Sequence, residues 1–288
     1  MVVFGTGSTY LTNTTKHGVI QLNRQKFDLL AVGTINIVLQ MYAVVWLAFN
    51  FNLNVLAIFF LLSMTTATMP VLFVHRAWSH KSWIPNRYLN WYGLFMYNIA
   101  LSGTAIGYVA THREHHKHTD VRGDPHSPYL RSRLSIQLVS TFDKINVNWM
   151  KNSIDLLRQP DHMWFARYYW YINIIFYGCL YLITPEYFPM FMALRGLGLI
   201  KGHLPNSIMH NPPWWVFPVK FSGHGASNSI ILNILFFGNG ECWHANHHED
   251  PTNWKIGKRW YEIDIGAQWI RLFVYLGWAT IPERKIQQ

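Results

Sequence analysis

Histidine is the residue type that dominates the chemistry available to this sequence. The chain of 288 residues contains 15 histidines, and most of them stand in three short motifs, HRAWSH, HREHH and HANHH. These motifs contribute His75, His80, His112, His115, His116, His244, His247 and His248. Neutral imidazole is the commonest side-chain metal ligand. The clustering therefore predicts a metal site rather than scattered surface histidines.

The spacing within the motifs indicates how many metals they serve. Positions i, i+3 and i+4 share one face of a helix, so each HxxHH triplet can direct three imidazoles to one place. His75 and His80 are about 140° apart on an ideal helix, and we expect His80 where that helix ends. Eight imidazoles are too many for one zinc ion and suit two metals. Imidazole also binds copper, iron and nickel, so the ligand type leaves the metal open.

Three carboxylates lie close to the motifs and could orient the imidazoles. Asp120 follows His116 by four positions, Glu241 precedes His244 by three, and Asp124 stands in RGDPHSP. A metal-bound imidazole commonly donates its second N–H to such a group. The alternative for each is an ordinary surface charge or turn residue.

Four apolar segments are available to position these residues. The first is an uncharged run of about 22 residues, enough to cross a bilayer at 1.5 Å per residue. We predict membrane-spanning helices at 29–50, 55–74, 168–184 and 187–200, the last interrupted by Arg195. A buried hairpin of a soluble protein is the alternative for the first pair, but length and lack of charge favour the membrane.

Charge distribution predicts the orientation of these spans. Both hairpin turns lack Lys and Arg, whereas the histidine-rich middle is basic, and Tyr88–Ala110 is typical of an interfacial helix. Both termini and the histidine motifs should lie on the cytoplasmic side. The expected fold is therefore an all-α membrane protein with one domain over residues 1–288. It has two transmembrane hairpins and a cytosolic helical cap that holds the metals.

Composition narrows the classes of partner that this chain is expected to bind. The formal net charge of +10 favours anionic lipid headgroups or a phosphate-bearing substrate carrier. A nucleic-acid partner is not expected, since no helix-turn-helix, zinc-finger or RNA-binding signature is present. The two cysteines, Cys179 and Cys242, do not form a disulfide framework and are predicted to be reduced thiols.

Beyond the histidines, longer stretches resemble one known family. The order HxxxxH, HxxHH, HxxHH, interleaved with two apolar hairpins, is similar to that of membrane fatty-acid desaturases of the stearoyl-CoA (delta-9) type. ATHREHHKHTD with GDPHSP, GECWHANHH and WYEIDIGAQWIRLF resemble bacterial and cyanobacterial members in particular. The resemblance covers roughly Lys26 to Trp278.

This resemblance implies a di-iron site completed by an NSxxH element, here Asn206 to His210. One iron would be held by His75, His80, His112, His116 and His247. The other would be held by His115, His210, His244 and His248, with Asn206 acting through water. The family also implies O2 as co-substrate and a fatty-acyl substrate linked to CoA, a carrier or a lipid. A separate cytochrome b5-like or ferredoxin-like electron donor would complete the system.

Two other functions stay open at the level of sequence. A related di-iron acyl hydroxylase or acetylenase would share the ligand spacing, although the match around GDPHSP favours simple desaturation. A non-enzymatic membrane metal binder would place its ligands at the bilayer midplane, whereas these motifs lie at or beyond the ends of the apolar runs. Cys242, Glu249-Asp250-Pro251 and Asn211-Pro212-Pro213 depart from the family pattern. Four tryptophans are expected either along a substrate channel or at the membrane interface, namely Trp78, Trp83, Trp243 and Trp254.

Overall fold

The computed structural model describes residues 8–62, 68–222, 225–235 and 238–283, with side chains from residue 28 onward. Helices dominate, and they surround a buried core that carries the histidine motifs. Two small antiparallel sheets are also present, so the fold is mostly helical rather than all-α. In one sheet β1 (Ile84–Pro85) pairs with β4 (Ala279–Thr280), and in the other β2 (Pro218–Phe221) pairs with β3 (Ser227–Ser229).

The N-terminal helix α1 (Ser8–Asn50) is the longest element. Its section Asp28–Asn50 is the one helix, within the described ranges, that is long and apolar enough to cross a membrane. The predicted second span, 55–74, lies only partly within the described residues. It comprises α2 (Leu53–Leu62), residues 63–67, which lie outside the described part of the chain, α3 (Thr68–Val71), and the start of η2 (Leu72–Ser79).

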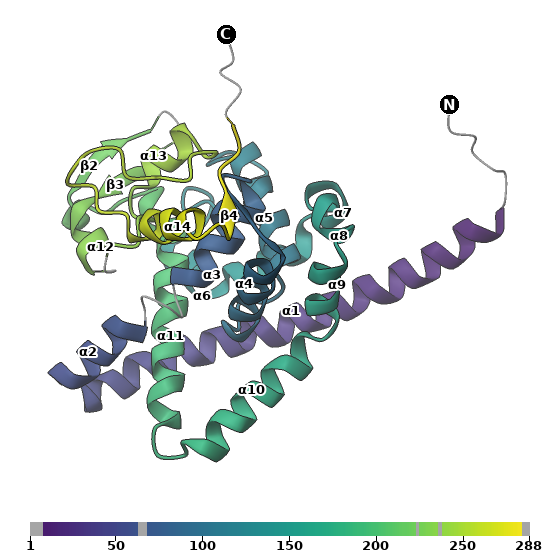
Figure 1. Cartoon of the computed structure of the whole chain (residues 1–288), viewed down its shortest axis with the longest axis horizontal. Helices are drawn as coiled ribbons and strands as arrows, with labels where there is room; N and C mark the ends of the chain where they lie inside the picture. The colour runs from purple at the N-terminus through teal and green to yellow at the C-terminus, as the bar shows by residue number, and fades with distance from the viewer. Residues whose placement is uncertain (1–7, 63–67, 223–224, 236–237, 284–288) are drawn as a thin grey trace, which may run out of the picture.

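The predicted second hairpin is present as α10 (Tyr169–Ile183) and α11 (Phe188–Leu204), which turn back on each other beside α1 (Figure 1). These helices have 15 and 17 residues, fewer than the roughly 20 that span a hydrocarbon core. Four membrane spans therefore remain a prediction. Close packing of α1 on α11 depends on Gly196, since a Cβ there would lie 2.0 Å from the Leu39 carbonyl oxygen.

The predicted interfacial segment forms two helices, α4 (Arg87–Ile99) and α5 (Ala105–Lys117). Asn86 and Thr104 cap their N-termini by accepting hydrogen bonds from the Leu89 and Gly107 N–H groups. The chain reverses between them at Gly103, whose φ of +86° suits glycine.

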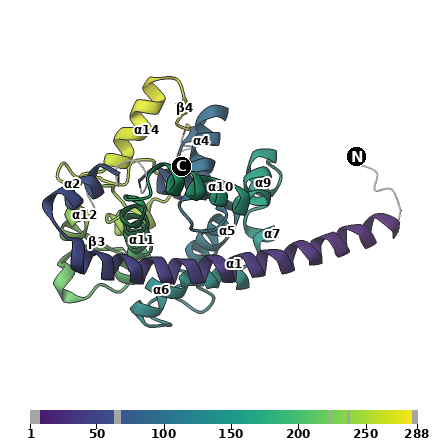
Figure 2. The ribbon, with the colours of Figure 1, turned by 90° about the horizontal axis from the view of Figure 1, so that it is seen from below.

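The remaining elements complete the cap. Residues 133–167 form α6 (Arg133–Asp143), η3 (Lys144–Asn146), α7 (Trp149–Asn152), α8 (Ile154–Leu157) and α9 (Pro160–Arg167). After α11 come η4 (Pro205–Met209), η5 (Trp214–Val216), α12 (Ile230–Leu235), α13 (His244–Glu249) and α14 (Ile265–Tyr275). Viewed from below, α1 runs along the base beside α6 and α11 (Figure 2).

Three of the four tryptophans are buried in the protein, and Trp254 is half-buried. Trp83 is fully buried and Trp78 almost so, both in the main apolar core, and Trp254 packs against that core. Trp243 is also buried and donates its indole N–H to the Ile263 carbonyl oxygen at 2.8 Å. The rings of Trp78, Trp83 and Trp243 thus fill the interior of this part of the molecule.

Candidate metal centre

The first motif brings its two histidines together because η2 is a π-helix. The His80 N–H donates to the His75 carbonyl oxygen, five positions back, at 3.3 Å. This wider turn places side chains five apart on nearly the same side, whereas an ideal α-helix separates them by about 140°. His80 caps the end of the helix, as predicted. The local helix type, and not only the turn of the chain after it, aligns the two rings.

The other two motifs are helical as the spacing predicts. α5 carries His112, His115 and His116, and α13 carries His244 and its two neighbours at i+3 and i+4. The rings interleave between the elements: that of His116 stacks on that of His248, with centroids 4.4 Å apart and planes at 14°.

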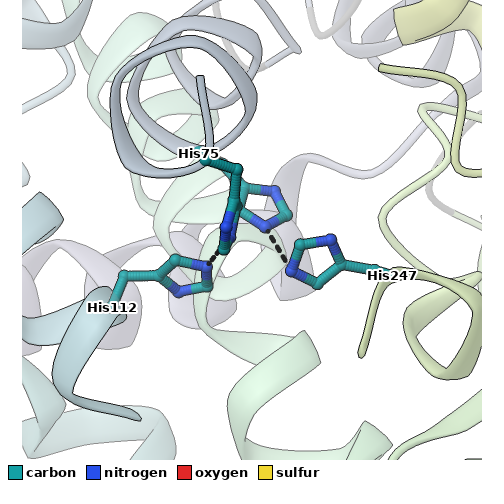
Figure 3. Close-up of side chains that lie close together, drawn as sticks. His75, His112 and His247 are labelled. Atoms are coloured by element: carbon teal, nitrogen blue, oxygen red, sulfur yellow. Dashed lines mark hydrogen bonds between the residues drawn. The ribbon is translucent and has the colours of Figure 1, made fainter. Parts of the chain in front are cut away.

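The imidazoles gather into two groups of four, with the ligand nitrogens of each group within 4.8 Å of one another. One group is His75, His80, His112 and His247, and the other is His115, His210, His244 and His248. Figure 3 shows His75, His112 and His247 of the first group pointing toward one another from three separate elements. His116 adjoins this group, its Nε2 being 3.0 Å from the Nε2 of His247.

Each of the three carboxylates singled out in the sequence contacts the Nδ1 atom of one imidazole. Glu241 lies 2.6 Å from His75, Asp124 lies 2.9 Å from His115, and Asp120 lies 2.7 Å from His210. A carboxylate accepts the Nδ1 proton of a neutral imidazole and leaves a lone pair on Nε2. The orientation of these three rings is thereby defined.

The distances between facing Nε2 atoms show whether a metal ion fits between them. Those of His115 and His210 are 3.2 Å apart, and both are acceptors because both Nδ1 atoms donate to carboxylates. Two facing lone pairs repel each other unless a cation lies between them. Two nitrogens bound to one ion at right angles, each about 2.1 Å from it, lie about 3.0 Å apart. The His210–His244 and His75–His247 contacts are both 3.0 Å.

Burial favours the neutral imidazoles that a metal requires. It lowers the pKa of His112, His244 and His247 well below the usual value, and neighbouring imidazoles lower it further. Burial alone would raise the pKa of Glu241, but His75 and Arg76 hold the pKa of this carboxyl at about 2. The donor set thus consists of neutral nitrogens backed by ionised carboxylates, which suits divalent cations.

Arg76 is a site residue that the histidine motifs did not indicate. It is 1% exposed, and its guanidinium donates to Glu241 at 2.9 Å and to Asp264 at 3.0 Å. It also donates to the carbonyl oxygens of Asn239 and Trp254. One buried arginine therefore connects the first motif, the third motif and the C-terminal segment. The feature of the sequence that could have indicated Arg76 is its position directly after His75, at the end of an apolar run.

Three further histidines differ in their surroundings. The ring of His126 stacks on that of His115 at 4.5 Å, and His115, Asp124 and His126 form a third group of possible ligands. His203 donates its Nδ1–H to the Gln137 backbone carbonyl oxygen at 2.9 Å and lines a cavity beside the imidazoles. His118 is half-buried beside Glu114.

A cavity adjoins the imidazoles. His75, His112 and His244 line one part of it, and Asn206 lies on the same wall. Val71, Val74 and Leu199 contribute apolar surface. A chain-like molecule in this cavity would pass directly beside the candidate metal positions.

Comparison with known proteins identifies relatives with a common chemistry. No protein-family model matches the chain. It is 32% identical over 215 residues to the acyl-CoA C20 Delta5-desaturase of Anemone leveillei, covering 72% of this chain and 66% of that protein. It is 31% identical over 212 residues to the sn-2 palmitoyl-lipid 9-desaturase of a Nostoc species, covering 71% and 73%. A third relative, Delta-9 desaturase-like 4 protein of Arabidopsis thaliana, is 29% identical over 242 residues, covering 82% and 76%. The chain therefore belongs to the fatty-acid desaturase family and is an oxidoreductase that acts on a fatty-acyl substrate.

Proposed function

We propose that this chain introduces a cis double bond, at the delta-9 position, into a saturated fatty-acyl chain with O2 as co-substrate. The observation that carries the proposal is the pair of histidine groups beside a cavity with apolar walls. A related hydroxylase or acetylenase would need the same groups, but the relatives are named desaturases.

We further propose that the two groups hold two iron ions, divided as the family resemblance implies. His75, His80, His112, His116 and His247 would bind one, and His115, His210, His244 and His248 would bind the other, with Asn206 acting through water. When bound, this pair supplies the O2 activation that an unactivated methylene group demands and that no side-chain acid or base provides.

The protein's own residues have three tasks in this scheme. Glu241, Asp124 and Asp120 keep their imidazoles in the Nδ1–H tautomer and so direct Nε2 inward. Val71, Val74 and Leu199 exclude water from the acyl chain. The cavity selects the reacting bond by position, since a displacement of about one ångström can move a different carbon into reach.

The membrane arrangement is part of the proposal. We place spans at residues 29–50, 55–74, 168–184 and 187–200 of a single domain, with both termini and the histidine motifs on the cytoplasmic side. Exposed apolar side chains along α1 and α10 support lipid contact, among them Val38, Val44, Ile174 and Ile175. An acidic electron donor, cytochrome b5-like or ferredoxin-like, would dock on the basic cytosolic surface.

Expression in a host that lacks its own desaturase tests the proposal. Gas chromatography with location of the double bond should detect a new cis-monounsaturated acyl chain. His116→Ala and His247→Ala should abolish the product while the protein still accumulates in the membrane, and His118→Ala should leave it. Unchanged lipids, with iron and an electron donor supplied, would refute desaturation. Activity in either ligand variant would refute the ligand assignment.

A further inference from the structure

The cavity beside the imidazoles has a second end, which lies away from the candidate metal positions. Three walls of the cavity begin at a residue of the candidate site and continue along helical segments, so the distance of each lining residue from the site can be followed. One wall runs from His75 to Pro70, another from His112 to Tyr108, and the third runs from Asn206 in η4 back along α11 to Arg195. The α11 part of this wall, from Leu204 to Arg195, corresponds to roughly 14 Å of helix at 1.5 Å per residue.

This second end is cationic. It is lined by Arg195, by Lys144, which is 7% exposed, and by the buried Tyr97. We call these three residues the inner chamber. The Nζ atom of Lys144 lies 5.9 Å from the centre of the Tyr108 ring and donates to the Ser102 carbonyl oxygen at 2.6 Å.

Charge compensation is incomplete in the inner chamber. Within the described ranges Arg195 makes no hydrogen bond or ion pair, and its buried Nε atom and the Tyr97 hydroxyl both lack a partner. The acidic neighbour of Lys144, Asp143, accepts instead from Arg131 at 2.8 Å. Among the described residues that line the cavity, the one carboxylate is Glu241, which is bonded to His75 and Arg76 at the opposite end.

A cation that is removed from water without a counter-ion destabilises the folded protein. Arg195 is half-buried and its Nε atom is enclosed, so part of the cost of removing an unpaired charge from water applies to it. An arginine within an apolar helix is therefore a candidate for a functional role. The methyl end of an ordinary acyl chain would leave the guanidinium and the Tyr97 hydroxyl without acceptors. A carboxylate supplies acceptors to both and matches the planar fork of arginine.

We propose that the inner chamber binds a carboxylate at one end of the chain that is desaturated. The inference rests on the proposed function, because the chain that reaches the chamber must pass the imidazoles. Two sources share this chemistry. An unesterified fatty acid could enter carboxylate first, or a thioester-linked chain could carry a second carboxylate at its far end.

Binding measurements separate these possibilities without requiring turnover. The iron-loaded, full-length protein is titrated in detergent without O2, and tryptophan fluorescence reports binding. One pair of probes is ionised palmitic acid and methyl palmitate. The second pair is the mono-CoA thioester of hexadecanedioic acid and palmitoyl-CoA. In one of the two pairs, we expect the member with the additional free carboxylate to bind about tenfold or more tightly than the member without it.

Variants assign that preference to the inner chamber. Arg195→Gln should abolish the preference, Arg195→Lys should restore part of it, and the exposed-site control Arg158→Gln should retain it. If Arg195→Gln does not fold, Lys144→Gln and Tyr97→Phe, which line the same chamber, should each reduce the preference. Selectivity in the palmitic acid pair identifies the free acid, and selectivity in the thioester pair identifies the far-end carboxylate.

Two results would overturn the proposal: no preference in either pair, or an equal loss of affinity for all probes in the chamber variants. Loss of lipid products in the expression host would instead contradict the desaturase function, and the binding result would still stand.

Discussion

The Nδ1 contacts of His75, His115 and His210 show how much of the site's geometry depends on groups outside the imidazoles. Each ring is held by its own carboxylate: Asp120 and Asp124 lie in the loop after α5, and Glu241 precedes the third motif. Glu241 is in turn held by Arg76, whose guanidinium also spans to Asp264. Because Asp264 caps α14 by accepting from the Ala267 N–H, the orientation of His75 is tied to the C-terminal helix.

Replacing Arg76 should therefore destabilise the whole cap. Arg76→Met leaves two buried carboxylates without their counter-ion, and breaking a buried ion pair in this way typically costs about 3–5 kcal/mol. The variant should show a clearly lower Tm in detergent than the wild type. Arg158→Met, at an exposed position, is the matched control and should stay within about 0.5 kcal/mol of the wild type. Equal Tm values for the two variants would show that the arginine network contributes nothing.

A second arginine, Arg113, connects the first two motifs. The carboxylate that it contacts makes the stability of the protein depend on pH. Arg113 donates to the Ser79 and Trp78 carbonyl oxygens and contacts Asp155 at 2.7 Å, and Lys81 contacts the same carboxylate at 2.9 Å. Burial alone would raise the pKa of Asp155, but the hydrogen bonds from both cations hold it below its usual value. Stability from this carboxylate is present above the ordinary aspartate pKa of about 3.9 and is lost as the pH falls through the folded-state value.

Asp155→Asn should consequently lower the Tm at neutral pH by a margin that shrinks on acidification below about pH 4. Chelator-treated wild type and variant should be compared, so that loss of metal does not contribute. A margin that stays constant from pH 7 to about pH 3 would contradict the ion-pair interpretation.

At the scale of elements, three short helical segments determine where the imidazoles meet. The π-helix η2 aligns His75 with His80, and α5 and α13 present their triplets at i, i+3 and i+4. None of these segments is long, and α13 has only 6 residues, too few to be stable alone. They hold their positions through the surrounding core and, we expect, through the metals.

Metal binding should accordingly stabilise the protein. A ligand that binds only the folded state at a thousand times its Kd contributes about 4 kcal/mol. Adding Fe(II) anaerobically to chelator-treated protein should raise the Tm, and His247→Ala should reduce the increase because His247 contacts both His75 and His116. Mg²⁺, which prefers oxygen ligands, is the control and should have no effect. An identical Tm with and without Fe(II) would argue against a metal centre.

At the scale of the whole molecule, α1, α10 and α11 form a base with exposed apolar surface, and the cap with the histidine motifs lies to one side of it (Figure 1). The same α11 that packs on α1 supplies the cavity wall from Lys201 to Arg195. One helix thus belongs both to the apolar base and to the cavity beside the imidazoles.

The proposed topology places the α10–α11 turn and the C-terminal loop on opposite sides of the membrane. Single cysteines at Glu186→Cys and Arg259→Cys test this in a Cys179→Ser background, since Cys179 is exposed and Cys242 is buried. In intact spheroplasts a membrane-impermeant maleimide should label only position 186, and permeabilisation should expose position 259. Labelling of both positions before permeabilisation would contradict the two-hairpin arrangement.

By itself, the sequence determined the histidine ligand candidates, the helical form of both HxxHH triplets and the family, because these depend on spacings of a few residues and on local motifs. The π-helix was not predictable, since its energy depends on the packing of η2. Only the tertiary structure decided which carboxylate pairs with which imidazole, that Arg76 connects three segments, and that Arg195 faces the same cavity as the ligands. The Arg76–Asp264 pair joins positions 188 apart, and such contacts arise from the packing of the entire core, which no local pattern encodes.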